Sequence, residues 1–111
     1  MAQLTDITTW VFDLDNTLYP PSMALFPQVN AKMTAYVMDV LGVAEAEADR
    51  LRHNYYMEHG TTLAGLMTHH EIDPEPYLIA VHDIDFSVLS PDPKLADAIA
   101  ALPGRKIIYT N

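Results

Sequence analysis

An apolar run that ends in two aspartates limits the folds open to this chain. Trp10, Val11 and Phe12 precede Asp13, and Asp15 follows after a single leucine. Three consecutive apolar residues predict a short buried strand, which the turn-prone residues 16–21 bring to an end. Side chains two residues apart in an extended segment point to the same side, so both carboxylates face one small volume. We therefore expect the acids at the carboxyl end of a strand, where open α/β sheets bind ligands.

The spacing of Asp13 and Asp15 has chemical consequences. Two close carboxylates repel each other, and a hard divalent cation such as Mg2+ relieves the repulsion by taking oxygen ligands. One aspartate can then attack phosphorus and form an aspartyl-phosphate. The other can protonate the leaving alkoxide and later take a proton from water. The alternative is a strand-to-turn junction with solvated acids; the preceding strand and Thr17 favour the catalytic interpretation.

The segment Phe12–Tyr19 (FDLDNTLY) resembles the first motif, D-x-D-x-T, of the haloacid-dehalogenase-like (HAD) hydrolases. The resemblance implies that Asp13 is the nucleophile and Asp15 the general acid and base. It also implies that Mg2+ is held by the Asp13 carboxylate and the Asp15 main-chain carbonyl. With an aspartate at its second acidic position, the motif resembles that of the phosphatase branch rather than that of the dehalogenase branch.

The segment Lys106–Asn111 (KIIYTN) resembles the second motif of the same family, with Thr110 as the phosphate-binding hydroxyl. Asn111, Asn16 and Thr17 are expected to complete the phosphate site. The family's third motif supplies a lysine and its fourth one or two acids, both after the second motif. The three lysines lie at positions 32, 94 and 106, so none follows Thr110. We therefore expect the chain to hold the amino-terminal portion of such an enzyme.

Helical spacing dominates the segment between the two motifs. The expected order of strand, helical insertion, helix and strand is an α/β fold with a right-handed parallel crossover. It corresponds to a partial HAD-like (Rossmannoid) parallel core over residues 1–19 and 90–111, with a helical cap over residues 20–89 inserted after the first strand. Helices are expected over residues 27–42, 44–59, 61–67, 77–81 and 93–102. Arg105 and Lys106 are expected to start the second strand, which continues over residues 107–110.

Two segments of the expected cap bear on the substrate. Residues 60–66 (GTTLAGL) are similar to a cap segment of the pyrimidine 5'-nucleotidase-like branch of the HAD hydrolases, which implies pyrimidine nucleoside monophosphates as substrates. The hydroxyls of Thr61 and Thr62 either meet an anionic ligand or cap a helix. Residues 82–87 (HDIDFS) repeat the D-x-D pattern, but His82 interrupts the apolar run and two prolines precede it. We expect no second catalytic strand there; the segment resembles the return from cap to core in the same branch.

The charge balance limits the kinds of partner that the chain is expected to bind. Fifteen acids against six bases give a formal charge of −9, which argues against nucleic acid polymers and anionic membranes. A small-molecule phosphate ester is the expected partner. Cysteine is absent, and no signal peptide or membrane-spanning apolar stretch is visible, so a cytoplasmic location is expected. Pairs of metal ligands on one helix are usually three or four residues apart. His69 and His70 are adjacent, and His53 and His59 are six residues apart, so no metal role is expected for these histidines.

Two classes of function therefore compete. The first is a Mg2+-dependent phosphomonoester hydrolase, and the family resemblance implies a 5'-nucleotidase. The second is a non-catalytic fragment or a Mg2+- or anion-binding module, because the lysine and the later acids are missing. Another small-molecule HAD phosphatase or a dehalogenase is a weaker alternative. Two strands with one crossover helix leave a sheet edge open, so self-association through that edge is also expected.

Overall fold

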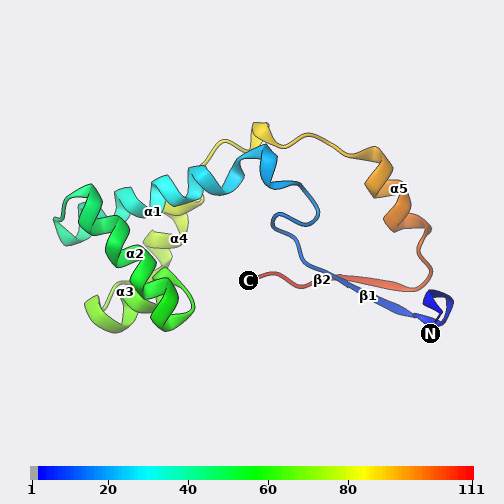
Figure 1. The fold of residues 1–111 in the computed structure, drawn as a ribbon, viewed down its shortest axis with the longest axis horizontal. Helices are drawn as coiled ribbons and strands as arrows, with labels where there is room; N and C mark the ends of the chain where they lie inside the picture. The colour runs from blue at the N-terminus through cyan, green and yellow to red at the C-terminus, as the bar shows by residue number, and fades with distance from the viewer. Residues whose placement is uncertain (1–2) are drawn as a thin grey trace. The chain divides into compact units, whose positions relative to one another are not determined.

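The computed structural model describes residues 3–111, and the first two residues of the expected core segment lie outside this range. The chain divides into two compact units, which Figure 1 shows as ribbons. The α/β unit comprises residues up to Ala24 together with Ser87–Asn111, and the helical unit is Leu25–Phe86. The α/β unit contains β1 (Thr9–Phe12), α5 (Pro93–Ala101) and β2 (Arg105–Ile108). The helical unit contains α1 (Leu25–Leu41), α2 (Glu45–His59), α3 (Thr62–His70) and α4 (Pro74–Val81). Short 3-10 turns cover Leu4–Asp6, Pro21–Met23 and Phe86–Val88.

The two strands form a parallel pair, as the sequence predicts, and the chain is mixed α/β with more helix than strand. The register runs from Thr9 opposite Arg105 to Phe12 opposite Ile108. The second strand begins at Arg105 as expected, but it ends at Ile108 rather than at Thr110. The reason is that its partner β1 ends at Phe12, which lies opposite Ile108.

The turn between α5 and β2 is fixed on β1. Gly104 has φ +93°, and a Cβ at this position would lie 2.3 Å from the Thr8 carbonyl oxygen, so only glycine fits. The Trp10 indole Nε1 donates to the Pro103 carbonyl oxygen at 2.8 Å. Asp92 caps the amino terminus of α5 as predicted, accepting a hydrogen bond from a main-chain amide of its first turn at 3.1 Å. These contacts hold the register of the parallel pair.

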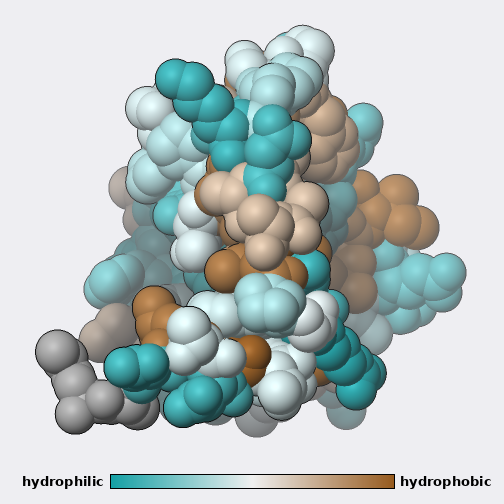
Figure 2. Space-filling view, turned by 90° about the vertical axis from the view of Figure 1, so that its right-hand side faces the viewer, coloured by the Kyte–Doolittle hydropathy of each residue, from teal (hydrophilic) through white to brown (hydrophobic). Residues whose placement is uncertain are grey.

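Several apolar side chains of the α/β unit are exposed to solvent. None of its described residues is fully buried. Val11 is 63% exposed, Ile108 55% and Tyr109 78%. Figure 2 shows apolar side chains lying among polar ones on the surface of the molecule. The strands are therefore held by main-chain pairing and by the turn contacts rather than by a closed core.

The helical unit has a core of its own. Helix α1 packs against α2 and α4, and α2 packs against α3. The rings of Tyr36 and Tyr77 meet edge to face with centroids 5.1 Å apart. Ala48 and Tyr55 lie on the buried face of α2 as predicted, whereas Ala44 is the exposed residue that precedes the helix. The buried cluster consists of Val37, Ala48, Tyr55, Leu66, Tyr77 and Val81.

The helix boundaries follow from local chemistry, with one correction. Gly60 ends α2 with φ 85°, and the Thr61 hydroxyl caps α3 by accepting from the Ala64 amide at 3.0 Å. The prolines at positions 74 and 76 were expected to break the chain before a helix over residues 77–81. Helix α4 instead begins at Pro74 behind an Asp73 cap, because first-turn residues need no N–H donor. None of the helices in the described part of the chain is both long and apolar enough to cross a membrane.

Candidate functional site

The two aspartates leave β1 directly into a tight turn. Asp13 is the first residue after the strand, and a turn begins at Asp15. The Leu14 carbonyl oxygen accepts the amides of Thr17 at 3.2 Å and of Leu18 at 2.9 Å. Asn16 has φ 57°, a left-handed conformation that asparagine tolerates better than most residues. The acids therefore lie at the carboxyl end of a parallel strand, where sequence reasoning expected them.

Each carboxylate is held by a hydroxyl four residues later. The Thr17 hydroxyl donates to Oδ2 of Asp13 at 2.8 Å. The Tyr19 hydroxyl donates to Oδ1 of Asp15 at 2.7 Å. Hydrogen bonds to ionised groups are stronger than neutral ones and restrict the carboxylate geometry. One oxygen of each acid is thus engaged by its own turn, and the two acids are fixed independently.

Tyr19 contacts the second aspartate of the candidate site, a contact that sequence reasoning missed. Desolvation by burial raises the pKa of Tyr19 to about 12, and the hydrogen bond to Asp15 and the charge of that carboxylate act in the same direction. Tyr19 lines a hollow beside the turn. Apolar side chains line the same hollow, among them Leu18, Met23 and, from α5, Leu95 and Ile99. The phenol therefore remains a proton donor to Asp15 across neutral pH. The available signal was the spacing of four residues, which Tyr19 shares with Thr17.

Thr110 and Asn111 follow the second strand at the same edge. Phe12 lies opposite Ile108, and the Tyr109 amide donates to the Phe12 carbonyl oxygen at 2.9 Å, which extends the pairing by one residue. The carboxyl ends of parallel strands meet at one edge of a sheet, so the chain at Thr110 leaves the sheet on the side of Asp13. Thr110 and Asn111 are both exposed there.

The residues at this edge have the donor chemistry that Mg2+ requires. Asp13 is exposed and Asp15 half-buried, so both carboxylates are open to solvent. Mg2+ binds oxygen ligands, and protein sites commonly supply one or two carboxylates while water completes the shell. The Asp13 carboxylate and the Asp15 main-chain carbonyl, the ligands implied by the family resemblance, are ligands of this kind.

The two segments of the helical unit that bear on the substrate have structural roles. The Thr61 hydroxyl caps α3, and the Thr62 hydroxyl donates to the Arg52 carbonyl oxygen at 2.9 Å. A Cβ on Gly65 would lie 2.3 Å from Cβ of Tyr55, so the glycine serves close helix packing. The Thr61 hydroxyl is therefore used as a helix cap, and the Thr62 hydroxyl in a contact between α3 and α2.

The D-x-D segment of the helical unit forms no strand among its described residues, as predicted. The Gln28 side chain clamps the main chain of Asp85: its Nε2 donates to the Asp85 carbonyl oxygen at 3.0 Å, and its Oε1 accepts from the Asp85 amide at 2.9 Å. The His82 Nδ1 lies 2.7 Å from the Leu78 carbonyl oxygen. These contacts tie the loop to α1 and α4 rather than to a sheet.

No family model matches the chain. The chain is 30% identical over 99 residues to Phosphate metabolism protein 8 of Saccharomyces cerevisiae. The aligned region covers 86% of this chain and 31% of that protein, so the chain spans about a third of the length of its relative. The chain is thus similar to a protein of phosphate metabolism over most of its own length.

Proposed function

We propose that this chain carries the nucleophile and the general acid–base of a Mg2+-dependent phosphomonoester hydrolase of the HAD type. The observation that carries the proposal is the pair of acids at the carboxyl end of β1, each fixed by its own hydroxyl donor. The similarity to a phosphate metabolism protein supports it. Asp13 is the proposed nucleophile and Asp15 the proposed acid and base.

The first step transfers the phosphoryl group to Asp13. Thr17 engages Oδ2, so Oδ1 of Asp13 is the oxygen placed to attack phosphorus. A P–O bond to Asp13 forms as the ester P–O bond breaks, and the leaving alkoxide takes a proton from Asp15. Tyr19 engages Oδ1 of Asp15, so the transferred proton is carried on Oδ2.

The second step returns the enzyme to its starting state. Asp15, now a carboxylate, takes a proton from a water molecule that attacks phosphorus, and the bond to Asp13 breaks to release inorganic phosphate. Thr110, Asn111 and Asn16 are the proposed phosphate-binding residues at this edge of the sheet. Thr17 acts by positioning Asp13, which refines its expected role in phosphate binding.

Mg2+ would be held by the Asp13 carboxylate and the Asp15 main-chain carbonyl, and it would offset the negative charge of the phosphoryl group and of the two acids. Such compensation matters here because the chain has a formal charge of −9. The lysines at positions 32, 94 and 106 all lie outside the turn that holds the acids.

The proposed substrate class is pyrimidine nucleoside 5'-monophosphates, and it rests on the resemblance of residues 60–66 and 82–92 to the nucleotidase-like branch. The hydroxyls of Thr61 and Thr62 are used inside the helical unit, so we propose no contact between them and the nucleotide.

Phosphate release tests the proposal. Pyrimidine and purine nucleoside 5'-monophosphates and p-nitrophenyl phosphate are incubated with the 111-residue chain, with and without Mg2+. We expect Mg2+-dependent release that Asp13→Asn abolishes while substrate binding remains. Asp6→Asn, the same substitution at an exposed acid of the Leu4–Asp6 turn, is the matched control and leaves the rate unchanged. Equal rates for Asp13→Asn and the wild type would overturn the proposal, and a preference for purines would overturn only the substrate class.

The charge balance favours a second candidate for the chain taken alone, a Mg2+- and phosphate-binding module without turnover. No lysine lies in the turn from Asp13 to Tyr19, so the charge that develops on the phosphoryl group has little compensation from the residues of this turn. This candidate predicts Mg2+ binding that Asp13→Asn weakens and no detectable phosphate release. Mg2+-dependent turnover by the 111-residue chain would exclude it.

A further inference from the structure

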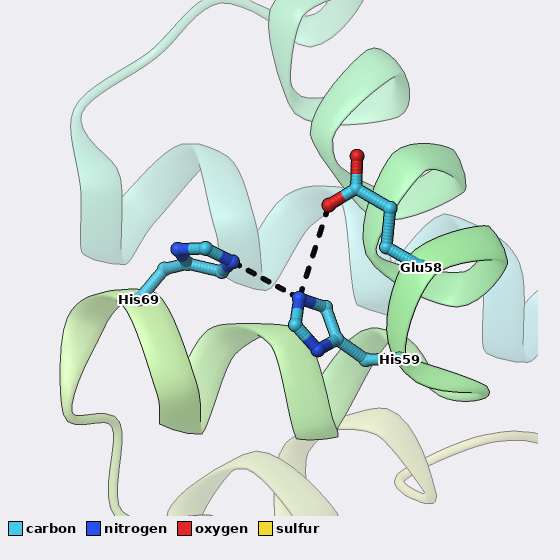
Figure 3. Close-up of side chains that lie close together, drawn as sticks. All are labelled: Glu58, His59 and His69. Carbon is cyan, nitrogen blue, oxygen red and sulfur yellow. Dashed lines mark hydrogen bonds and ion pairs between the residues drawn. The ribbon is translucent and has the colours of Figure 1, made fainter.

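Two histidines and a glutamate come together where α2 ends and α3 crosses it. Nε2 of His59 lies 3.0 Å from Nε2 of His69, and 3.9 Å from Oε2 of Glu58. The ligand atoms of all three side chains lie within 4.8 Å of one another. Figure 3 shows the two imidazole rings pointing toward each other from different helices, with the Glu58 carboxylate beside them. We refer to Glu58, His59 and His69 as the histidine cluster.

The fold brings His69 to Glu58 and His59 although ten residues of sequence separate His59 from His69. Gly60 ends α2 with φ 85°, and the Thr61 cap starts α3 at once, so the two helices are joined by a very short turn. Gly65 lets α3 approach Tyr55 of α2 closely. His59, the last residue of α2, therefore lies beside His69 in the last turn of α3. Spacing rules for ligand pairs within one helix cannot detect this arrangement.

A buried tyrosine holds the rings in place. Tyr55 is 8% exposed, and its ring stacks on His69 with centroids 5.1 Å apart and an interplanar angle of 10°. The Tyr55 hydroxyl and Nε2 of His70 are 2.6 Å apart, so His70 is engaged by the tyrosine rather than by the cluster. The stacked ring restricts the orientation of the His69 imidazole. The cluster is thus supported from behind by a residue of the core.

The donor set is that of a nitrogen-preferring divalent ion. Two imidazole nitrogens with one carboxylate and an open fourth position form a common tetrahedral Zn2+ arrangement. Metal–nitrogen bonds of about 2.0–2.1 Å place tetrahedral ligands roughly 3.3–3.4 Å apart. The nitrogens of His59 and His69, 3.0 Å apart, would separate slightly, and the Glu58 carboxylate, 3.9 Å away, would move in slightly. Glu58 and His69 are exposed, so these side chains have room to adjust.

We propose that the histidine cluster binds Zn2+ or a similar nitrogen-preferring divalent ion and joins the end of α2 to the end of α3. The proposal does not depend on phosphatase activity, because all three ligands belong to the helical unit and none belongs to the Asp13 turn. The two sites also differ in chemistry: oxygen donors at the strand ends suit Mg2+, and imidazoles suit Zn2+. Binding to the folded state alone also raises the melting temperature.

Titration calorimetry of ZnCl2 into the 111-residue chain, in excess Mg2+, tests the site. We expect one Zn2+ per chain, with affinity reduced at least about tenfold in His59→Gln and in His69→Gln. His53→Gln, an exposed histidine of α2 outside the cluster, is the matched control and leaves the affinity unchanged. Circular dichroism of each variant reports whether the helices are intact. Glu58→Gln is a further variant. The Glu58 side chain is exposed, so we expect the variant to fold normally and to bind Zn2+ more weakly than the wild type.

The same titrations define what would contradict the proposal. Absence of stoichiometric Zn2+ binding by the folded wild-type chain would overturn it. So would affinity that survives in the folded double variant H59Q/H69Q. Binding that is lost in Asp13→Asn but unchanged in both histidine variants would place the ion at the acid pair and overturn the proposal as well. Co2+ provides a second readout, since its visible absorption in a tetrahedral site containing nitrogen should appear in the wild type and in His53→Gln only.

Discussion

Substitution of Gly65 by alanine is the sharpest perturbation of the helical unit. Gly65 lies in α3 against Tyr55 of α2, and both residues are buried. An added Cβ would lie 2.3 Å from Cβ and Cγ of Tyr55 and 2.9 Å from its Cδ1. Carbon atoms in contact are normally about 3.5–4.0 Å apart. A rotamer change cannot relieve the clash, because Tyr55 Cβ is attached directly to the main chain of α2.

Two opposing terms set the size of the effect. Alanine in a helix interior is favoured over glycine by about 1 kcal/mol. Overpacking a well-packed core costs about 1–3 kcal/mol, occasionally more. An overlap of more than 1 Å with two carbons belongs at or above the top of this range, because α2 and α3 must move apart. We therefore expect Gly65→Ala to lower the free energy of unfolding by about 2 kcal/mol.

Thermal unfolding followed by circular dichroism measures this effect. A loss of about 2 kcal/mol lowers the melting temperature of a domain of this size by roughly 8–16 °C. Thr68→Ala, at an exposed position of the same helix, is the matched control and shifts the melting temperature little. Adding Tyr55→Phe to Gly65→Ala does not restore stability, because phenylalanine keeps the clashing Cβ and Cγ. A melting temperature for Gly65→Ala equal to or above that of the wild type would refute the packing argument.

Four further predictions follow, two for the acid turn, one for the helical core and one for the sheet. Tyr19→Phe removes the donor to Asp15 and should lower phosphate release about tenfold, with Tyr56→Phe, an exposed tyrosine, as control. Because the pKa of Tyr19 is raised to about 12, its contribution to stability is fully present below pH 10 and is lost as pH rises through 12; pH-dependent melts of the two tyrosine variants check this. Thr34→Val removes a 2.6 Å hydrogen bond from a buried hydroxyl to an aspartate of α2 and should cost about 1–3 kcal/mol in denaturant unfolding. Self-association through the open sheet edge should appear as concentration-dependent sedimentation that Ile108→Lys reduces; a monomer at every concentration would contradict it.

Local chemistry made much of the fold predictable from the sequence. Gly60 ends a helix because it accepts a positive φ, and Thr61 and Asp92 begin helices because their side chains accept main-chain amides. The buried face of α2 follows from apolar spacing, which places Ala48 and Tyr55 inward. Each of these features depends on residues within a few positions of one another.

The errors in the element boundaries have physical causes. Pro74 was expected to break the chain, whereas proline is compatible with the first turn of a helix and here begins α4. The second strand ends at Ile108 rather than at Thr110, because its partner β1 ends at Phe12 opposite Ile108. Hydrophobic patterns locate buried residues, and they do not mark where an exposed strand loses its partner.

The candidate sites show the same division between local and long-range contacts. The position of Asp13 and Asp15 after a strand followed from local sequence, and the Tyr19 contact lies at a spacing that inspection of the turn could have revealed. The contact between His59 and His69 depends on how α3 crosses α2, which in turn depends on the close approach at Gly65. No spacing rule within one helix encodes such a contact, so only the folded chain reveals it.

Covalent trapping is the most direct test of the central claim that Asp13 is a phosphoryl acceptor. The 111-residue chain is incubated with Mg2+ and a small phosphoryl donor such as acetyl phosphate, quenched in acid and analysed by peptide mass spectrometry. The account predicts a phosphoryl group on Asp13 that requires Mg2+, persists longer in Asp15→Asn and is absent from Asp13→Asn. A phosphoryl group on another residue, or Mg2+-dependent phosphate release that continues in Asp13→Asn, would contradict the account.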